Sequence, residues 1–112
     1  MGVKKDAGEL LLYFYGELVI KNRQQISSEH VINETMWNAS KINHAFHYLK
    51  DLEMIKEISG LGNFNGVDNF VVLGLSPKGI DIIENKPKFK RHFSFELGVP
   101  EVFKFSWGAD EE

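Results

Sequence analysis

Four side chains that both donate and accept hydrogen bonds recur along one short segment of the chain: Ser40, Asn43, His44 and His47. An α-helix turns by about 100° per residue. If the stripe Ile42–Phe46–Leu49 is the buried side of such a helix, these four side chains point away from the core. Hydroxyl, amide and imidazole groups suit the edges of nucleic-acid bases, and asparagine suits adenine in particular. Lysines on the flanks of the same helix could reach phosphate groups. The candidate nucleic-acid contacts are therefore Ser40, Lys41, Asn43, His44, His47 and Lys50.

The histidines allow two other kinds of chemistry. His44 and His47 share one helical face and could hold a metal ion together, with His30 nearby on the preceding segment. They could also form a pH-sensitive contact, because histidine titrates near neutral pH. No carboxylate or thiolate completes a metal motif, and the chain has no cysteine. We therefore expect no metal and no cofactor.

Signals for catalysis are weak throughout the chain. The glycine-rich stretch GLGNFNG lacks the lysine of a phosphate-binding loop and lies between strand-like segments rather than before a helix. No nucleophile elbow, zinc-protease motif or carboxylate pair stands out. We expect the protein not to be an enzyme.

The charge pattern gives only local support to nucleic-acid binding. The formal net charge is −3, whereas a nucleic-acid-binding domain is usually basic on at least one face. The segment KPKFKR, from Lys86 to Arg91, carries basic residues and no acid. The last residues, Asp110–Glu112, are all acidic and are expected to be a solvated end.

Three helices are expected to come first, and they would position the polar segment. Apolar residues at helical spacing predict a helix over Lys5–Ile20. A short helix would begin after Ser27 or Ser28 and end near Glu34. Asn38 is a suitable N-cap for the helix that carries the candidate contacts, over residues 38–50.

Strand-like segments follow these helices. Ile55–Ser59 and Phe70–Leu75 read as two strands, and Gly60–Asn69 between them is rich in residues that tolerate positive φ. Ser76, followed by proline, is expected to cap a helix over Lys78–Asn85.

This order of elements, over about Glu9–Asn85, resembles the winged helix-turn-helix superfamily. LKDLEMIKE is similar to the superfamily's step into the first wing strand, and LSPKGIDIIE to its helix after the wing. The resemblance implies that this protein is a small transcription regulator and that it inserts helix 38–50 into the major groove of double-stranded DNA. The wing departs from the usual pattern, because its single charged residue is Asp68.

The C-terminal part alternates aromatic and polar residues. Between Phe89 and Trp107 this period of two predicts two short strands around a turn. The expected fold class is therefore α+β: a winged helix of three core helices, a two-stranded wing and a further helix over residues 1–88. Residues 89–112 would add a β extension and the acidic tail.

The aromatic stripe and the first helix are too apolar to lie in water. They could pack on each other, form a homodimer interface, or line a pocket for a ligand or peptide. The residues expected at a dimer interface are Leu12, Tyr15, Val19, Phe93, Phe95, Phe103, Phe105 and Trp107.

Two functions from different classes remain open. A DNA-binding protein should carry positive potential around Lys41, Lys50, Lys21 and Arg23, and Ala at Asn43 and His47 should abolish specific binding with little change in stability. A protein-interaction module should instead expose an apolar patch. No apolar run approaches the roughly 18 residues of a membrane span, and we expect a cytoplasmic protein.

Overall fold

A computed structural model describes residues 2–95 of the chain. Within this range the fold is α+β, with five α-helices and a three-stranded antiparallel sheet, and its layout is compatible with a winged helix. The elements in chain order are α1 (Val3–Tyr15), the π-helical turn η1 (Gly16–Ile20), β1 (Ile26–Ser27), α2 (Ser28–Thr35), α3 (Ala39–Asp51), β2 (Ile55–Phe64), β3 (Val67–Leu75), α4 (Pro77–Ile83) and α5 (Lys86–His92).

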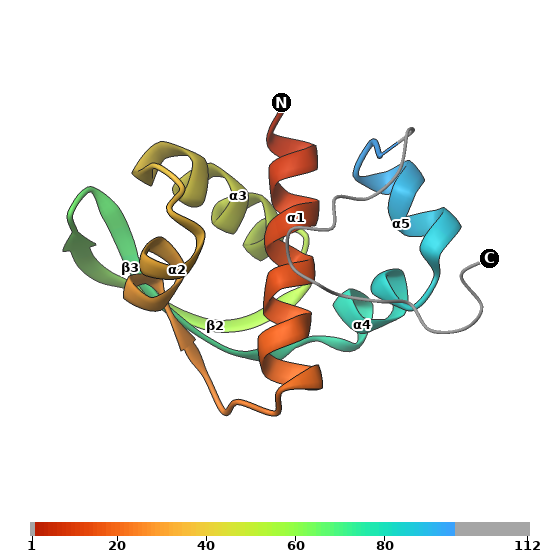
Figure 1. The fold of residues 1–112 in the computed structure, drawn as a ribbon, viewed down its shortest axis with the longest axis horizontal. Helices are drawn as coiled ribbons and strands as arrows, with labels where there is room; N and C mark the ends of the chain where they lie inside the picture. Colours follow the sequence, from red (N-terminus) through yellow and green to blue (C-terminus); the bar gives the residue numbers. More distant parts are fainter. Residues whose placement is uncertain (1, 96–112) are drawn as a thin grey trace.

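The sheet has the strand order β1-β3-β2 (Figure 1). Strands β2 and β3 pair from Ile55↔Leu75 to Phe64↔Val67, which leaves Asn65 and Gly66 as the turn. Both turn residues have positive φ, 52° and 84°, as a two-residue hairpin turn requires. The hairpin is therefore longer than the sequence predicted, since the expected loop Gly60–Asn69 is mostly strand with irregular pairing after Ser59.

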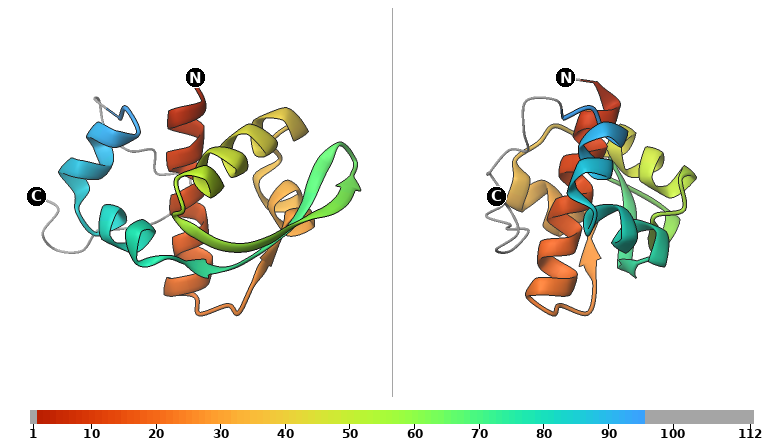
Figure 2. Two further views of the ribbon diagram at one scale, coloured as in Figure 1. Left: turned by 180° about the vertical axis from the view of Figure 1, so that it is seen from behind. Right: turned by 90° about the vertical axis from the view of Figure 1, so that its right-hand side faces the viewer.

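Helix α1 runs through the middle of the molecule and is covered on more than one side (Figures 1 and 2). It contacts α3, β3 and α4. The Tyr15 hydroxyl donates a hydrogen bond to Glu84 Oε2 at 3.0 Å, which links α1 to the residue that ends α4. Helix α1 can be apolar over most of its circumference because neighbouring elements of the same chain enclose it.

Three helix starts predicted from capping residues are confirmed. The side chains of Ser27, Asn38 and Ser76 accept hydrogen bonds from backbone N–H groups in the first turns of α2, α3 and α4. These bonds satisfy donors that a helix leaves without an internal partner. The Asn38 cap therefore fixes where α3 begins, and the buried residues Ile42, Phe46 and Leu49 define its inward face.

The β extension predicted from residue 89 is wrong for the described residues. Residues 86–92 form α5, whose N-cap Asn85 accepts a hydrogen bond from Lys88 N, with Pro87 in the first turn. The proline is compatible with the start of this helix, because its fixed φ suits a first-turn position. Helix α5 also crosses the domain boundary expected after residue 88.

Phe93 and Phe95 follow α5 and pack on α1. A Cβ on Gly8 would lie 2.7 Å from Phe95 Cε2 and 2.8 Å from Phe93 Cβ, so the missing side chain lets both rings approach. One expectation was a ligand pocket between the aromatic stripe and the first helix. At Phe93 and Phe95, the rings themselves fill this space. The aromatic stripe therefore packs on the chain's own first helix, as far as Phe95.

Most of the described residues expected at a dimer interface are already buried within one chain. Leu12, Tyr15, Phe93 and Phe95 are at most 9% exposed, so they offer almost no surface to a second copy. Val19 is 43% exposed. The other three expected residues, Phe103, Phe105 and Trp107, lie outside the described residues. Among the described helices, none has the length and apolar character needed to cross a membrane.

Candidate nucleic-acid interface

The outward face of α3 carries the six predicted contact residues, but their surroundings differ. Ser40, His44 and His47 are exposed, whereas Lys41, Asn43 and Lys50 are half-buried. Ser40 Oγ and His44 Nδ1 lie 3.3 Å apart and hydrogen-bond each other in the first two turns. This pair is the part of the predicted face that is exposed and, among the described residues, forms no hydrogen bond with the hairpin.

Asn43 and His47 hold the β2–β3 hairpin against α3. Asn43 Nδ2 donates to the carbonyl oxygen of Gly66 at 3.0 Å, and Asp68 N donates to Asn43 Oδ1 at 2.9 Å. His47 Nε2 and Asp68 Oδ2 are 2.8 Å apart. We refer to these contacts among Asn43, His47, Gly66 and Asp68 as the hairpin clamp. Because of the clamp, α3 and the hairpin form one structural unit.

The two lysines of the face also have partners within the chain. Lys50 Nζ donates to Ser59 Oγ at 3.1 Å, which adds a contact between the end of α3 and β2. Lys41 Nζ lies 3.8 Å from Asp6 Oδ1 of α1 and 4.1 Å above the centre of the Trp37 ring. Lys41 therefore ties the first turn of α3 to the first turns of α1.

The hairpin clamp corrects the expectation that Ala at Asn43 and His47 would change stability little. Replacing Asn43 by Ala removes two hydrogen bonds that cross from α3 to the hairpin, so we expect the free energy of unfolding to fall by about 1–2 kcal/mol. Denaturant unfolding measures this change. Ser40→Ala is the matched control on the same helix and should change stability by less than about 0.5 kcal/mol. Equal effects of the two substitutions would show that the clamp does not stabilise the fold.

The positive charges of Lys21 and Arg23 share one buried carboxylate, which reduces the positive potential expected there. Glu17 lies on the π-helical turn, where its side chain is only 7% exposed, and its carboxylate pairs with Lys21 Nζ and Arg23 Nε, both at 2.9 Å. His30 Nε2 lies 3.8 Å from the same carboxylate. The opposite charges compensate the buried carboxylate, so this side of the molecule is an ion-pair network rather than a basic face.

The sequence allowed a metal site formed by His44, His47 and His30, but in the structure these histidines have separate partners. His44 bonds Ser40 and His47 bonds Asp68. Among the described residues, the metal-ligating side chains that come together are instead Glu17, His30 and Glu34, with ligand atoms within 4.8 Å of one another. Because the Glu17 carboxylate already binds Lys21 and Arg23, we interpret this group as part of the ion-pair network.

Gly66 and Asp68 belong to the candidate site although reasoning from the helix alone omitted them. They lie 23 and 25 residues from Asn43 in the sequence. Their signal was present in the hairpin: Asn65-Gly66 suits a two-residue turn, and Asp68 is the charge nearest to that turn. A hairpin of known register places both next to the outward face of the preceding helix.

No protein-family model matches the chain, and neither a curated protein nor a solved structure matches it.

Proposed function

We propose that the protein is a winged-helix transcription regulator that binds double-stranded DNA with α3 and the β2–β3 hairpin. The observation that carries the proposal is the hairpin clamp, which holds the two polar elements in a fixed relation. A reading surface held in place before binding loses less conformational freedom on binding than a mobile one. Its layout, in which α2, α3 and the hairpin follow one another, supports the same proposal.

Within this proposal, the residues have two separate roles. Ser40 and His44 lie in the N-terminal half of α3, are exposed, and would contact base edges in the major groove. Asn43, His47 and Lys50 position the hairpin beside the helix. The hairpin would approach the DNA backbone through its uncharged polar residues, which contribute hydrogen bonds but no counterion release.

We further propose that the protein acts in the cytoplasm as a homodimer, which would present two copies of α3 to a palindromic site. Among the described residues of the predicted interface, Val19 is available to a second copy, and its neighbour Ile20 is 61% exposed. Both belong to the π-helical turn that ends α1.

Selection from a random-sequence duplex library at low and moderate salt tests the function, with the oligomeric state measured on the same sample. The double variant Ser40→Ala/His44→Ala should reduce affinity for the selected sequence at least about tenfold, since each good base contact contributes roughly 1–3 kcal/mol. Its thermal stability should match that of the wild type. Gln24→Ala is the control, because Gln24 is exposed in the loop before β1. An unchanged affinity of the double variant would remove α3 from the proposed interface.

One observation favours a second candidate, a protein-interaction module without DNA binding. Ile58 of β2 and Leu73 of β3 are 48% and 45% exposed, so the sheet offers apolar side chains to solvent. Failure of the wild type to retain any duplex at low salt would favour this candidate over the DNA-binding proposal.

A further inference from the structure

The basic segment KPKFKR forms a helix whose cations are directed outward. Phe89 is fully buried and stacks at 5.7 Å on Phe95, which anchors α5 to the core. Lys88 and Arg91 are exposed and Lys90 is half-buried. Because one aromatic residue fixes the orientation of this short helix, the sequence places three cations together on its free side.

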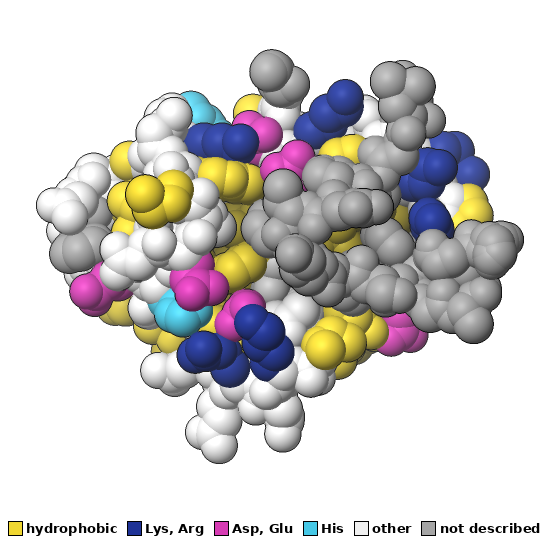
Figure 3. Space-filling model, viewed as in Figure 1, with side chains coloured by type: hydrophobic (Ala, Val, Ile, Leu, Met, Phe, Trp, Pro, Cys, Tyr) yellow, Lys and Arg dark blue, Asp and Glu magenta, His cyan; other side chains and the backbone are white. Residues whose placement is uncertain are grey.

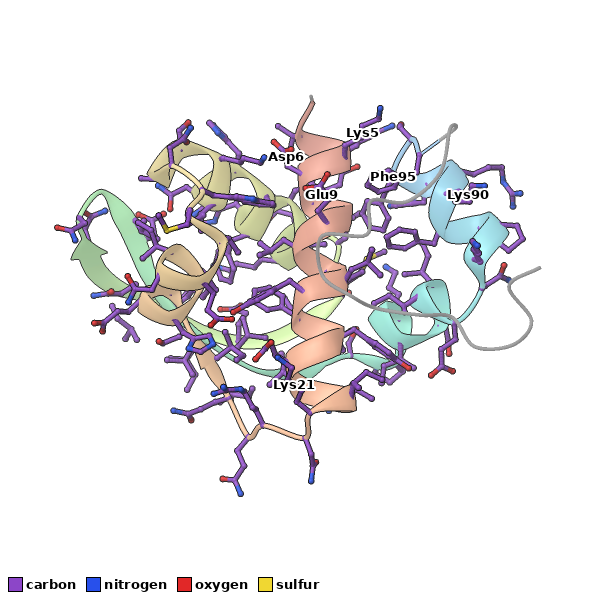
Figure 4. The ribbon with its side chains drawn as sticks, viewed as in Figure 1. Lys5, Asp6, Glu9, Lys21, Lys90 and Phe95 are labelled. Carbon is purple, nitrogen blue, oxygen red and sulfur yellow. The ribbon has the colours of Figure 1, made fainter. Side chains whose placement is uncertain are left out.

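Basic residues from two other helices extend this group. Lys4 and Lys5 belong to the first turns of α1, and Lys78 to the first turn of α4. Burial, followed by the positive charges of Lys4 and Lys78, lowers the pKa of His92 at the end of α5. Figure 3 shows dark blue side chains over α5 and beside the start of α1, and Figure 4 shows Lys5 and Lys90 along the same edge. We name Lys4, Lys5, Lys78, Lys88, Lys90 and Arg91 the basic face.

Within the part of the chain that the structure describes, the basic face differs from Lys21, Arg23 and Lys41 in lacking acidic partners. Lys21, Arg23 and Lys41 each pair with a carboxylate. Within residues 2–95, no member of the basic face forms an ion pair. A group of like charges without counter-charges repels itself and attracts polyanions. The basic face therefore has the electrostatic character of a site for an anionic partner.

Acidic residues at the same edge weaken this character only in part. Figure 4 places Asp6 and Glu9 beside Lys5 on α1. Asp6 is paired with Lys41, and burial raises the pKa of Glu9. The chain's negative net charge lies mostly elsewhere, because five of its 16 acidic residues follow Phe95, against one of its 13 basic residues.

We propose that the basic face binds the phosphate backbone of duplex DNA, on the same duplex that α3 contacts. This inference rests on the proposed function and adds to it a second contact surface. Lysine and arginine side chains bind phosphate oxygens without reading sequence. The large apolar residue of α5, Phe89, is buried, so the helix lacks the exposed apolar side that membrane-surface helices insert between lipids.

The length of the molecule is comparable to one turn of a DNA duplex. Helices α3 and α5 lie on opposite sides of the N-terminal half of α1 (Figures 1 and 2). The longest axis of the molecule is 42 Å, and one turn of B-DNA is roughly 34–36 Å long. Within this proposal, contacts from α3 and from the basic face would be separated by no more than about one helical turn of DNA.

The test compares the wild type with the triple variant Lys88→Gln/Lys90→Gln/Arg91→Gln on the selected duplex and on an unrelated duplex of equal length. The slope of log K against log salt is negative, and each lost phosphate contact should reduce its magnitude by about 0.9. We therefore expect the slope of the triple variant to be smaller in magnitude by about 2 to 3. Affinity at ~0.1 M salt should fall about 10- to 100-fold on both duplexes alike. Lys21→Gln is the control for loss of an exposed positive charge outside both proposed surfaces, and a thermal melt confirms that both variants fold.

The outcomes separate this inference from the proposed function. Equal affinity and salt slope for the triple variant and the wild type would overturn the inference and leave the function of α3 standing. Binding that depends on the basic face but has no sequence preference, and no sensitivity to Ser40→Ala/His44→Ala, would support the inference and overturn sequence-specific reading. Failure to bind any duplex would overturn both. Binding to vesicles of phosphatidylcholine and phosphatidylserine, but not to DNA, would assign the basic face to a membrane instead.

Discussion

Replacing Gly79 by Ala is expected to lower the free energy of unfolding by about 3 kcal/mol, the upper part of the range for overpacked sites. Gly79 is buried in the first half of α4, and a Cβ there would be forced against the backbone carbonyl oxygen of Met54. The carbonyl carbon of Met54 would be only 3.2 Å away. Backbone atoms cannot rotate aside as a flexible side chain can, so α4 itself would have to move.

Movement of α4 would disrupt the contacts that attach it to the rest of the fold. Ser76 N donates to the same Met54 carbonyl oxygen at 3.1 Å, and Ser76 Oγ donates to the carbonyl oxygen of Glu53 at 2.7 Å. Both bonds join the start of α4 to the segment between α3 and β2. The loss would therefore appear as reduced stability of the whole domain, measured by denaturant or thermal unfolding.

Gly16→Ala is the matched control for this prediction. Gly16 is also helical, but a Cβ there meets no atom within 4 Å. Alanine should stabilise this position by up to about 1 kcal/mol, because glycine loses more conformational freedom on folding. If both substitutions changed stability in the same direction and by the same amount, the close approach of α4 to Met54 would be disproved.

Local signals in the sequence predicted several elements of the fold well. Helix α3 was expected over residues 38–50 and spans Ala39–Asp51, because its apolar spacing and its asparagine cap are both contained in the segment itself. The Ser76 cap of α4 was found for the same reason. These features depend on residues three or four apart, so a single sequence is sufficient to identify them.

The errors arose where a local pattern had two interpretations. The alternation of Phe93 and Phe95 with polar residues predicts a strand, whereas these rings follow α5 and pack beside Gly8. The first helix was expected to need either internal partners or a second copy of the chain. Only the fold shows that neighbours within the chain cover it, because those neighbours lie far away in the sequence.

The candidate site illustrates the same limit. The direction in which Asn43 and His47 point was predicted correctly from the helical period, but not the elements that they meet. The hairpin covers part of the outward face, and its contacts with Asn43 span 23 and 25 residues of sequence. The helical period alone therefore predicted that Asn43 and His47 contact DNA, whereas their hydrogen bonds are made within the protein.

Replacing Phe46 by Ala is expected to have the largest effect on the position of α3. Phe46 is fully buried, and its ring stacks on that of Phe70 in β3, with centroids 3.9 Å apart and an angle of 4° between the planes. Loss of a buried phenylalanine ring reduces the free energy of unfolding by about 3–5 kcal/mol, through lost burial and the cavity that remains. A domain is stable by only about 5–15 kcal/mol, so this loss would remove a large part of the free energy of unfolding.

Phe46→Leu separates the loss of volume from the loss of the aromatic contact. Leucine fills part of the cavity, so it should retain more than half of the stability that alanine loses. Thermal unfolding of both variants, with Ser40→Ala as the solvent-exposed control on the same helix, measures the difference. Since Asn43 and His47 flank Phe46 on α3, a displaced helix would also break the hairpin clamp. A Phe46→Ala variant as stable as Ser40→Ala would contradict the stacking of α3 on β3, and with it the fixed relation between helix and hairpin on which the proposed function depends.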